Sequence, residues 1–167
     1  MTTDVNGAAS TANNLLPYGE YEIVEKTAPT GYLNTGTVRR SFEIRTNGVV
    51  VNLTTADTAI KNDVIRGGVS VEKWDMELDR NDPQGDATLS GAVFEIYNRS
   101  KAGVVVSGKE YAPGQVVHTL TTGEDGSAST ENDPLPYGTY EIVEKVAPTG
   151  YLNTGIIHRT FTIGENG

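Results

Sequence analysis

The chain has 167 residues, a formal net charge of −9 and no cysteine. An acidic surface repels nucleic-acid phosphates and anionic membranes, and without cysteine neither disulfides nor a thiolate zinc site can stabilise the fold. No run approaches the roughly 18 apolar residues of a membrane-spanning helix. We therefore expect neither nucleic acid nor a membrane as a partner.

Short β-prone runs between turn residues predict a chain of strands without helices. In chain order the predicted strands are residues 21–27, 37–45, 49–53, 58–64, 69–75, 91–98, 103–107, 115–122, 139–146 and 156–163. Asn6-Gly7, Pro113-Gly114 and Asp125-Gly126 are turn dipeptides, the first and last of the kind found in hairpins. Many short strands at this spacing indicate an all-β, immunoglobulin-like sandwich.

The first part of the sequence is repeated near its end. Residues 2–48 align with residues 121–167 without a gap, at an offset of 119 residues, and 31 of these 47 positions are identical. A period of this length is that of one domain and too long for a solenoid repeat. The chain is therefore predicted to hold parts of two tandem modules, residues 1–66 and 67–167.

Polar side chains fall on the apolar faces of several predicted strands, because side chains alternate between the two faces of a strand. Lys73, Glu144 and Asn62 each point toward a core by this alternation. Glu25 does the same, and it occupies the position of Glu144 in the earlier copy. Their neighbours on the same faces are Val69 and Val71, Tyr140 and Ile142, Ile60 and Val64, and Tyr21 and Ile23, respectively.

Buried charges without partners cost several kcal/mol, so these groups are expected to meet one another. Removal from water favours a neutral lysine amine, which is a nucleophile, and a protonated glutamate, which can shuttle protons. Attack of lysine Nζ on asparagine Cγ would release ammonia and leave an amide crosslink. The alternative is that Lys73 and Glu144 are ordinary surface residues, and the apolar Val143 on the opposite face is in keeping with it.

The segment YEIVEKVAPTGY at residues 140–151 resembles the E-box of Cna B-type domains, Y-x-φ-x-E-x-x-A-P-x-G-Y, and the match recurs at residues 21–32. VEKWD at 71–75 and LSGAVFEIYN at 89–98 are similar to the first strand of that family, with its K-x-D motif, and to its L-x-G-A-x-F segment. These are isopeptide-forming modules of Gram-positive, SpaA-like pilins and surface adhesins. The resemblance implies a prealbumin-like β-sandwich located outside the cell, at the cell wall.

The resemblance also implies roles for single residues. It makes Lys73 the crosslinking lysine, Glu144 and Glu25 the catalytic glutamates, and Asn62 the acceptor. Asp63 is the alternative acceptor, although the alternation favours Asn62. On this assignment the module at 1–66 lacks the lysine strand and the module at 67–167 lacks the acceptor strand.

The family pairs its first and last strands in parallel, and a parallel connection needs about a dozen residues or more. A bond between Lys73 and Asn62 of one chain is therefore not expected. Neighbouring copies of the module are the expected partners, by head-to-tail strand completion or by crosslinking.

These features predict a structural stalk, pilin or fibre module that modifies itself once, and not an enzyme that turns over. We expect no cofactor and no metal, because the acidic loop at 79–86 has Gln84 where an EF-hand needs glycine, and because His118 and His158 lie on separate strands. The alternative is an adhesin domain that binds a host protein or glycan. Residues 49–120 occur once, so a binding site would be sought there, with residues 109–114 as its best candidate.

Overall fold

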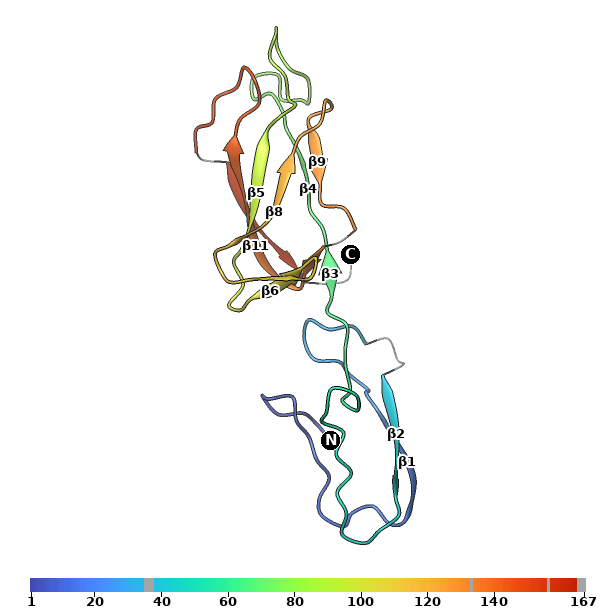
Figure 1. Cartoon of the computed structure of the whole chain (residues 1–167). Helices are drawn as coiled ribbons and strands as arrows, with labels where there is room; N and C mark the ends of the chain where they lie inside the picture. The colour runs from blue at the N-terminus through green and yellow to red at the C-terminus, as the bar shows by residue number, and fades with distance from the viewer. Residues whose placement is uncertain (35–37, 133, 156, 165–167) are drawn as a thin grey trace. The chain divides into compact units, whose positions relative to one another are not determined.

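The computed structural model describes residues 1–34, 38–132, 134–155 and 157–164. These residues form strands and no helix, which confirms the all-β prediction (Figure 1). The chain divides into two compact units, Met1–Pro29 with Asn34–Asp63 and Thr30–Leu33 with Val64–Gly167. The module boundary expected near residues 66–68 concerns the repeat and stays a prediction.

The first unit contains one antiparallel pair, β1 (Gly19–Val24) and β2 (Arg39–Ile44). Tyr21 lies opposite Phe42, and their rings stack with centroids 5.5 Å apart. The Tyr21 hydroxyl donates to the carbonyl of Pro17 at 2.7 Å, which ties the start of the strand to the preceding turn. The strand predicted from residue 37 begins outside the described residues.

Two predicted strands, 49–53 and 58–64, are wrong. Neither segment contains a named strand, and only Val64 enters an isolated bridge, with Tyr32. A turn stands at residues 55–59, where the amide of Ala59 donates to the carbonyl of Thr55 at 2.8 Å. A strand needs a partner to satisfy its backbone groups, and in the described part of the first unit β1 and β2 pair only with each other.

The second unit is built around a four-stranded antiparallel sheet in the order β12-β11-β5-β8. Its strands are β5 (Val93–Asn98), β8 (Val116–Thr121), β11 (Gly138–Val146) and β12 (His158–Ile163). The three smaller pairs are β3 (Arg66–Gly67) with β10 (Leu135–Pro136), β4 (Ser70–Glu72) with β9 (Ser127–Ser129), and β6 (Val104–Val106) with β7 (Lys109–Tyr111). Residue 156, where the last strand was predicted to begin, lies outside the described residues.

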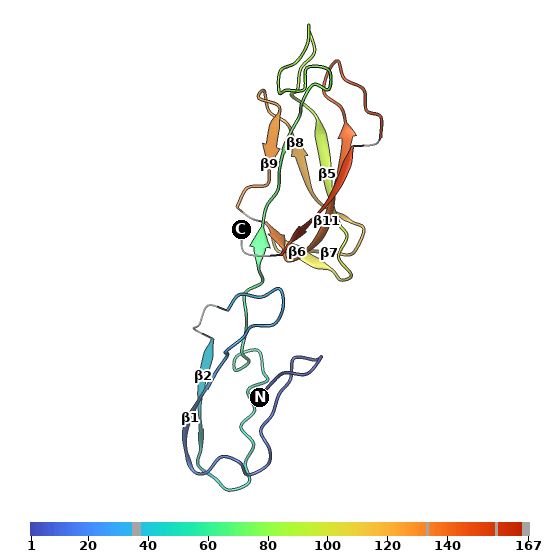
Figure 2. The ribbon, with the colours of Figure 1, turned by 180° about the vertical axis from the view of Figure 1, so that it is seen from behind.

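Strands β4 and β9 lie alongside the four-stranded sheet as a second layer (Figures 1 and 2). Val71 of β4 and Ala128 of β9 pack against the buried cluster of the larger sheet. The turn at Asp125-Gly126 forms as predicted, with Gly126 at φ +73°. It leads from β8 in one layer to β9 in the other, however, so it does not join two strands of one sheet.

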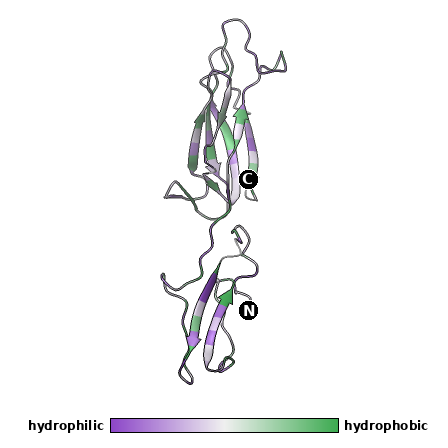
Figure 3. Cartoon of the chain, turned by 90° about the vertical axis from the view of Figure 1, so that its right-hand side faces the viewer, coloured by the Kyte–Doolittle hydropathy of each residue, from purple (hydrophilic) through white to green (hydrophobic). Residues whose placement is uncertain are grey.

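The core follows from the alternation of side chains along the strands, visible as bands of opposite hydropathy (Figure 3). Phe94, Ile96 and Asn98 of β5 are buried, whereas the residues between them are half-exposed. Tyr140 and Ile142 of β11 face the same cluster. The other buried members are Ala92, Val104, Val106, Val117, Leu120, Leu135 and Ile163.

Tyr140 gives this core a sensitivity to alkaline pH. Its side chain is fully buried, its hydroxyl donates to the carbonyl of Pro136 at 2.7 Å, and burial raises its pKa from 10.0 to about 12. The unfolded chain loses this proton first, so the contribution of Tyr140 is present below pH 10.0 and is lost as the pH rises through about 12.

We expect the stability advantage of the natural chain over Tyr140→Phe, about 1 kcal/mol near neutral pH from the hydrogen bond, to shrink over this window. Urea unfolding at a series of pH values measures it. An advantage that stays constant up to pH 12 would contradict the expectation.

Candidate functional site

Lys73 and Glu144 meet between the two layers of the second unit. The amide of Lys73 continues the ladder of β4 by donating to the carbonyl of Gly126 at 2.8 Å. Its Nζ lies 2.9 Å from Oε1 of Glu144 in β11, and the two side chains are 13% and 0% exposed. Strands β4 and β11 belong to different sheets, so this ion pair joins the layers. Both side chains point inward, as the alternation predicts.

The Glu144 carboxylate has unused capacity to accept hydrogen bonds. Both of its oxygens are buried and accept no aligned hydrogen bond from the described residues, so the close ammonium of Lys73 acts as a counter-charge. An ionised carboxylate offers about four lone-pair sites. Buried acceptors are rarely left this way, so the arrangement has room for a further hydrogen-bond donor.

A β-bulge follows directly after Glu144. Glu144 lies opposite Phe94 in β5, but the next pair is Val146 with Val93, so Lys145 is the extra residue. The bulge ends the alternation, and Val146 is 51% exposed although it has the parity of Glu144. Bulges beside a site re-aim side chains, and this one had no signal in the sequence.

Asn62 and Glu25 meet in the first unit. Nδ2 of Asn62 donates to Oε2 of Glu25 at 2.5 Å, and the contact is partly buried. Asp63 is exposed, so it is Asn62 that faces the glutamate. The side-chain amide of Asn62 therefore lies within hydrogen-bond distance of the glutamate carboxyl.

The two contacts complement each other. Glu25 and Glu144 occupy the same position of the repeat, one with an asparagine as its neighbour and the other with a lysine. Lys73 and Asn62 belong to different units. If one glutamate made both contacts, it would have a lysine and an asparagine as neighbours at the same time. The catalytic and crosslinking roles of these four residues stay predictions.

Sequence reasoning missed Asp75, which is only 4% exposed. It accepts hydrogen bonds from the amides of Glu77 and Leu78 at 2.8 and 2.9 Å, from Gln84, and from the Tyr151 hydroxyl at 2.8 Å. The amide of Leu78 is the main cause that lowers the pKa of this carboxyl. Burial, and then the bond to Asp75, raise the pKa of Tyr151. Asp75 shares the parity of Lys73, and this was the available signal.

The described residues contain no cluster of three His, Asp or Glu side chains that could hold a metal ion. None of them belongs to a helix of the length and hydropathy needed to cross a membrane. Residues 109–114, the candidate binding segment, form strand β7 of an ordinary hairpin and the turn after it.

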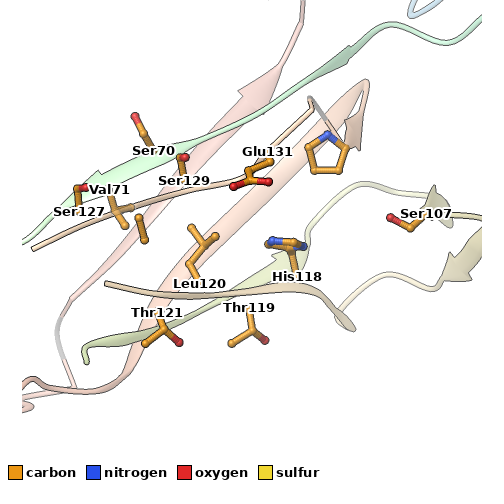
Figure 4. Close-up of a pocket in the computed structure, with 12 residues that line it drawn as sticks. Ser70, Val71, Ser107, His118, Thr119, Leu120, Thr121, Ser127, Ser129 and Glu131 are labelled. Carbon is orange, nitrogen blue, oxygen red and sulfur yellow. The ribbon is translucent and has the colours of Figure 1, made fainter. Parts of the chain in front are cut away.

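A groove of about 740 Å³ opens between β8 and β9 (Figure 4). Val71, Leu120 and Ala128 form its apolar part. Its other lining residues are Ser70, Ser107, His118, Thr119, Thr121, Ser127, Ser129, Glu131 and Pro134. The lining contains no Phe, Trp or Tyr ring on which a ligand could stack.

A comparison with curated proteins found no match. Among solved structures, the Bacillus anthracis TIE protein is similar at 30% identity and a TM-score of 0.65. The similarity covers 99% of this chain, which spans only 26% of that chain. The family model SpaA, a prealbumin-like fold domain, matches residues 1–59 and 75–167. This match confirms the resemblance seen in the E-box and the β-sandwich fold: the chain belongs to the SpaA family of prealbumin-like fold domains.

Proposed function

We propose that this chain is part of a structural stalk, pilin or fibre on the surface of a Gram-positive cell, stabilised by self-formed Lys–Asn isopeptide bonds. Membership of the SpaA family supports a pilin-like surface module. The observation that carries the chemistry is the buried contact of Lys73 Nζ with Glu144, 2.9 Å apart. The contact of Asn62 with Glu25 at the equivalent position supports an asparagine acceptor.

In the proposed reaction a proton of the Lys73 ammonium first passes to the glutamate, which leaves a neutral Nζ and a protonated carboxyl. The neutral Nζ then attacks Cγ of the asparagine, while the protonated glutamate donates a hydrogen bond to Oδ1. A new C–N bond forms and the bond from Cγ to Nδ2 breaks. The glutamate passes one proton from the attacking amine to the leaving nitrogen, which departs as ammonia. The glutamate ends as it began, and the product amide cannot react again, so the reaction happens once per site.

The bonds are proposed to act between neighbouring modules or chains. Lys73 and Asn62 lie in different units, each beside its own glutamate, which supports partners outside the unit. The partners are then further copies of the same module, arranged head to tail.

Intact mass spectrometry beside a denaturing gel tests this function on the 167-residue chain. We expect a ladder of multimers that survives boiling, with one ammonia lost for each bond. Lys73→Ala should abolish the ladder. Lys145→Ala, which removes the lysine next to Glu144 in β11, should leave it intact, because the Lys145 side chain is 46% exposed and its Nζ lies 3.8 Å from Glu95.

A monomer of full calculated mass would overturn bond formation by this chain. A monomer short of one ammonia would mean a bond within one chain, and the module boundary near residues 66–68 would be wrong.

The alternative function, binding of a host protein or glycan, has one feature in its favour. The residues that line the groove between β8 and β9 include several serines and threonines, whose hydroxyl groups can bond to sugars. The absence of Phe, Trp and Tyr from its described lining weighs against this function, because recognition sites commonly use such residues as anchors. We therefore place structural assembly first.

A further inference from the structure

A second polar contact joins the segment that follows β4 to the segment that follows β11. The Tyr151 hydroxyl donates to Oδ2 of Asp75 at 2.8 Å. Asp75 comes two residues after Lys73, and Tyr151 comes seven residues after Glu144. Backbone ladders hold strands within a sheet, whereas the offset between layers depends on side chains. The tyrosine therefore ties the lysine segment to the glutamate segment.

The Asp75 end of this contact is held in place. Its Oδ1 accepts the amides of Glu77 and Leu78, and Gln84 donates to both carboxylate oxygens. Its own amide donates to the carbonyl of Arg80 at 2.9 Å. The carboxylate that receives Tyr151 thus has little freedom to move.

The Tyr151 end is held by the turn that follows β11. The amide of Tyr151 donates to the carbonyl of Pro148 at 3.1 Å, and the amide of Thr88 donates to the carbonyl of Thr149 at 3.0 Å. Gly150 has φ +89°, and a Cβ there would lie 2.6 Å from Cβ of Ala87. Only glycine allows the turn to come so close to residues 87–88.

The repeat supplies an internal comparison. Tyr32 is the last residue of the E-box in the earlier copy, as Tyr151 is in the later one. Tyr32 is 45% exposed and forms a backbone bridge with Val64. Tyr151 is half-buried, with its hydroxyl on Asp75. The E-box segment alone therefore does not bury its last tyrosine, and at Tyr151 the hydroxyl bonds to the aspartate that follows the lysine.

We propose that Asp75 and Tyr151 are positioning residues that hold Lys73 Nζ in reach of Glu144, an inference that rests on the proposed function. A misplacement of about 1 Å can slow a positioned reaction by roughly 100-fold. Loss of one hydroxyl would free the lysine segment to move relative to β11 without removing any reacting group.

Tyr151→Phe tests the proposal, with Tyr32→Phe as the matched control from the earlier copy. We expect Tyr151→Phe to slow ammonia loss about 10- to 100-fold, and Tyr32→Phe to leave the rate unchanged. Labelling of Lys73 by an acylating reagent should be several times faster in Tyr151→Phe, relative to the exposed Lys145. Asp75→Asn combined with Tyr151→Phe should be little slower than either alone, because coupled partners are not additive.

A further variant separates positioning from stability. Val106→Ala, in the buried cluster, also lowers the free energy of unfolding. Its reaction rate is measured at the temperature where its free energy of unfolding equals that of Tyr151→Phe. Equal slowing by Val106→Ala at matched stability would overturn the positioning role, as would an unchanged rate and labelling in Tyr151→Phe. If the natural chain forms no bond, the proposed function fails, and faster labelling of Lys73 in Tyr151→Phe alone still supports the positioning contact.

Discussion

Glu144→Ala is expected to lower the free energy of unfolding of the second unit by about 3–5 kcal/mol. The glutamate side chain is 0% exposed, and its removal leaves the Lys73 ammonium, 13% exposed, without a counter-charge. The measurement is urea unfolding followed by the fluorescence of Trp74, the single tryptophan of the sequence. An Asn62→Ala background keeps the proposed crosslink from contributing.

Two controls test whether burial and pairing of the two charges cause this loss of stability. Glu25→Ala in the same background removes the equivalent, half-buried glutamate, and should cost no more than about 0.5 kcal/mol. Replacing both partners, Lys73→Met with Glu144→Leu, should restore most of the stability, because an apolar pair avoids the desolvation of two charges. Equal costs for Glu144→Ala and Glu25→Ala would contradict the view that the Lys73–Glu144 pair is buried and interdependent.

Tyr140→Ala is expected to cost about 3–5 kcal/mol, in the range for loss of a buried aromatic ring. The ring is 0% exposed and stacks on Phe161 with centroids 5.6 Å apart, and the hydroxyl bonds to Pro136. Removing it leaves a cavity in the centre of the core and an unpaired carbonyl. The midpoint and slope of the urea transition, again from Trp74, give the change.

Tyr21→Ala is the matched control, because Tyr21 repeats the same contacts with Phe42 and Pro17 in the earlier copy. It is only half-buried, so its removal should cost less than about 2 kcal/mol, measured by far-ultraviolet circular dichroism. Similar losses at the two positions would mean that burial does not set the effect.

The sequence alone predicts features that depend on neighbouring residues. The alternation of Tyr140, Ile142 and Glu144 is local, so the inward side of β11 could be assigned without knowing its partners. The turn at Gly126 and the absence of helices among the described residues follow from local residue preferences in the same way. The inward direction of Lys73 is also local, although β4 itself is shorter than predicted.

Features that depend on distant partners could not be predicted. Residues 49–53 have strong strand preference, but no described strand of the first unit pairs with them, and Val50 is 70% exposed. The bulge at Lys145 depends on how β11 meets β5, and the bond from Tyr151 to Asp75 joins residues far apart in the chain. The alternation of side chains describes one strand at a time, whereas these features depend on how two segments pair.

The placement of the Lys73–Glu144 contact has a mechanical consequence. In the described part of the chain β4 pairs only with β9, through three residue pairs, whereas β11 has neighbours on both sides. Tension that enters along β3 would load the two residue pairs of β3 with β10 and then the three pairs of β4 with β9. The contact of Lys73 with Glu144 transmits this force to β11, an inner strand of the four-stranded sheet. Detaching β4 would then require force on the whole sheet and not only on the β4–β9 ladder.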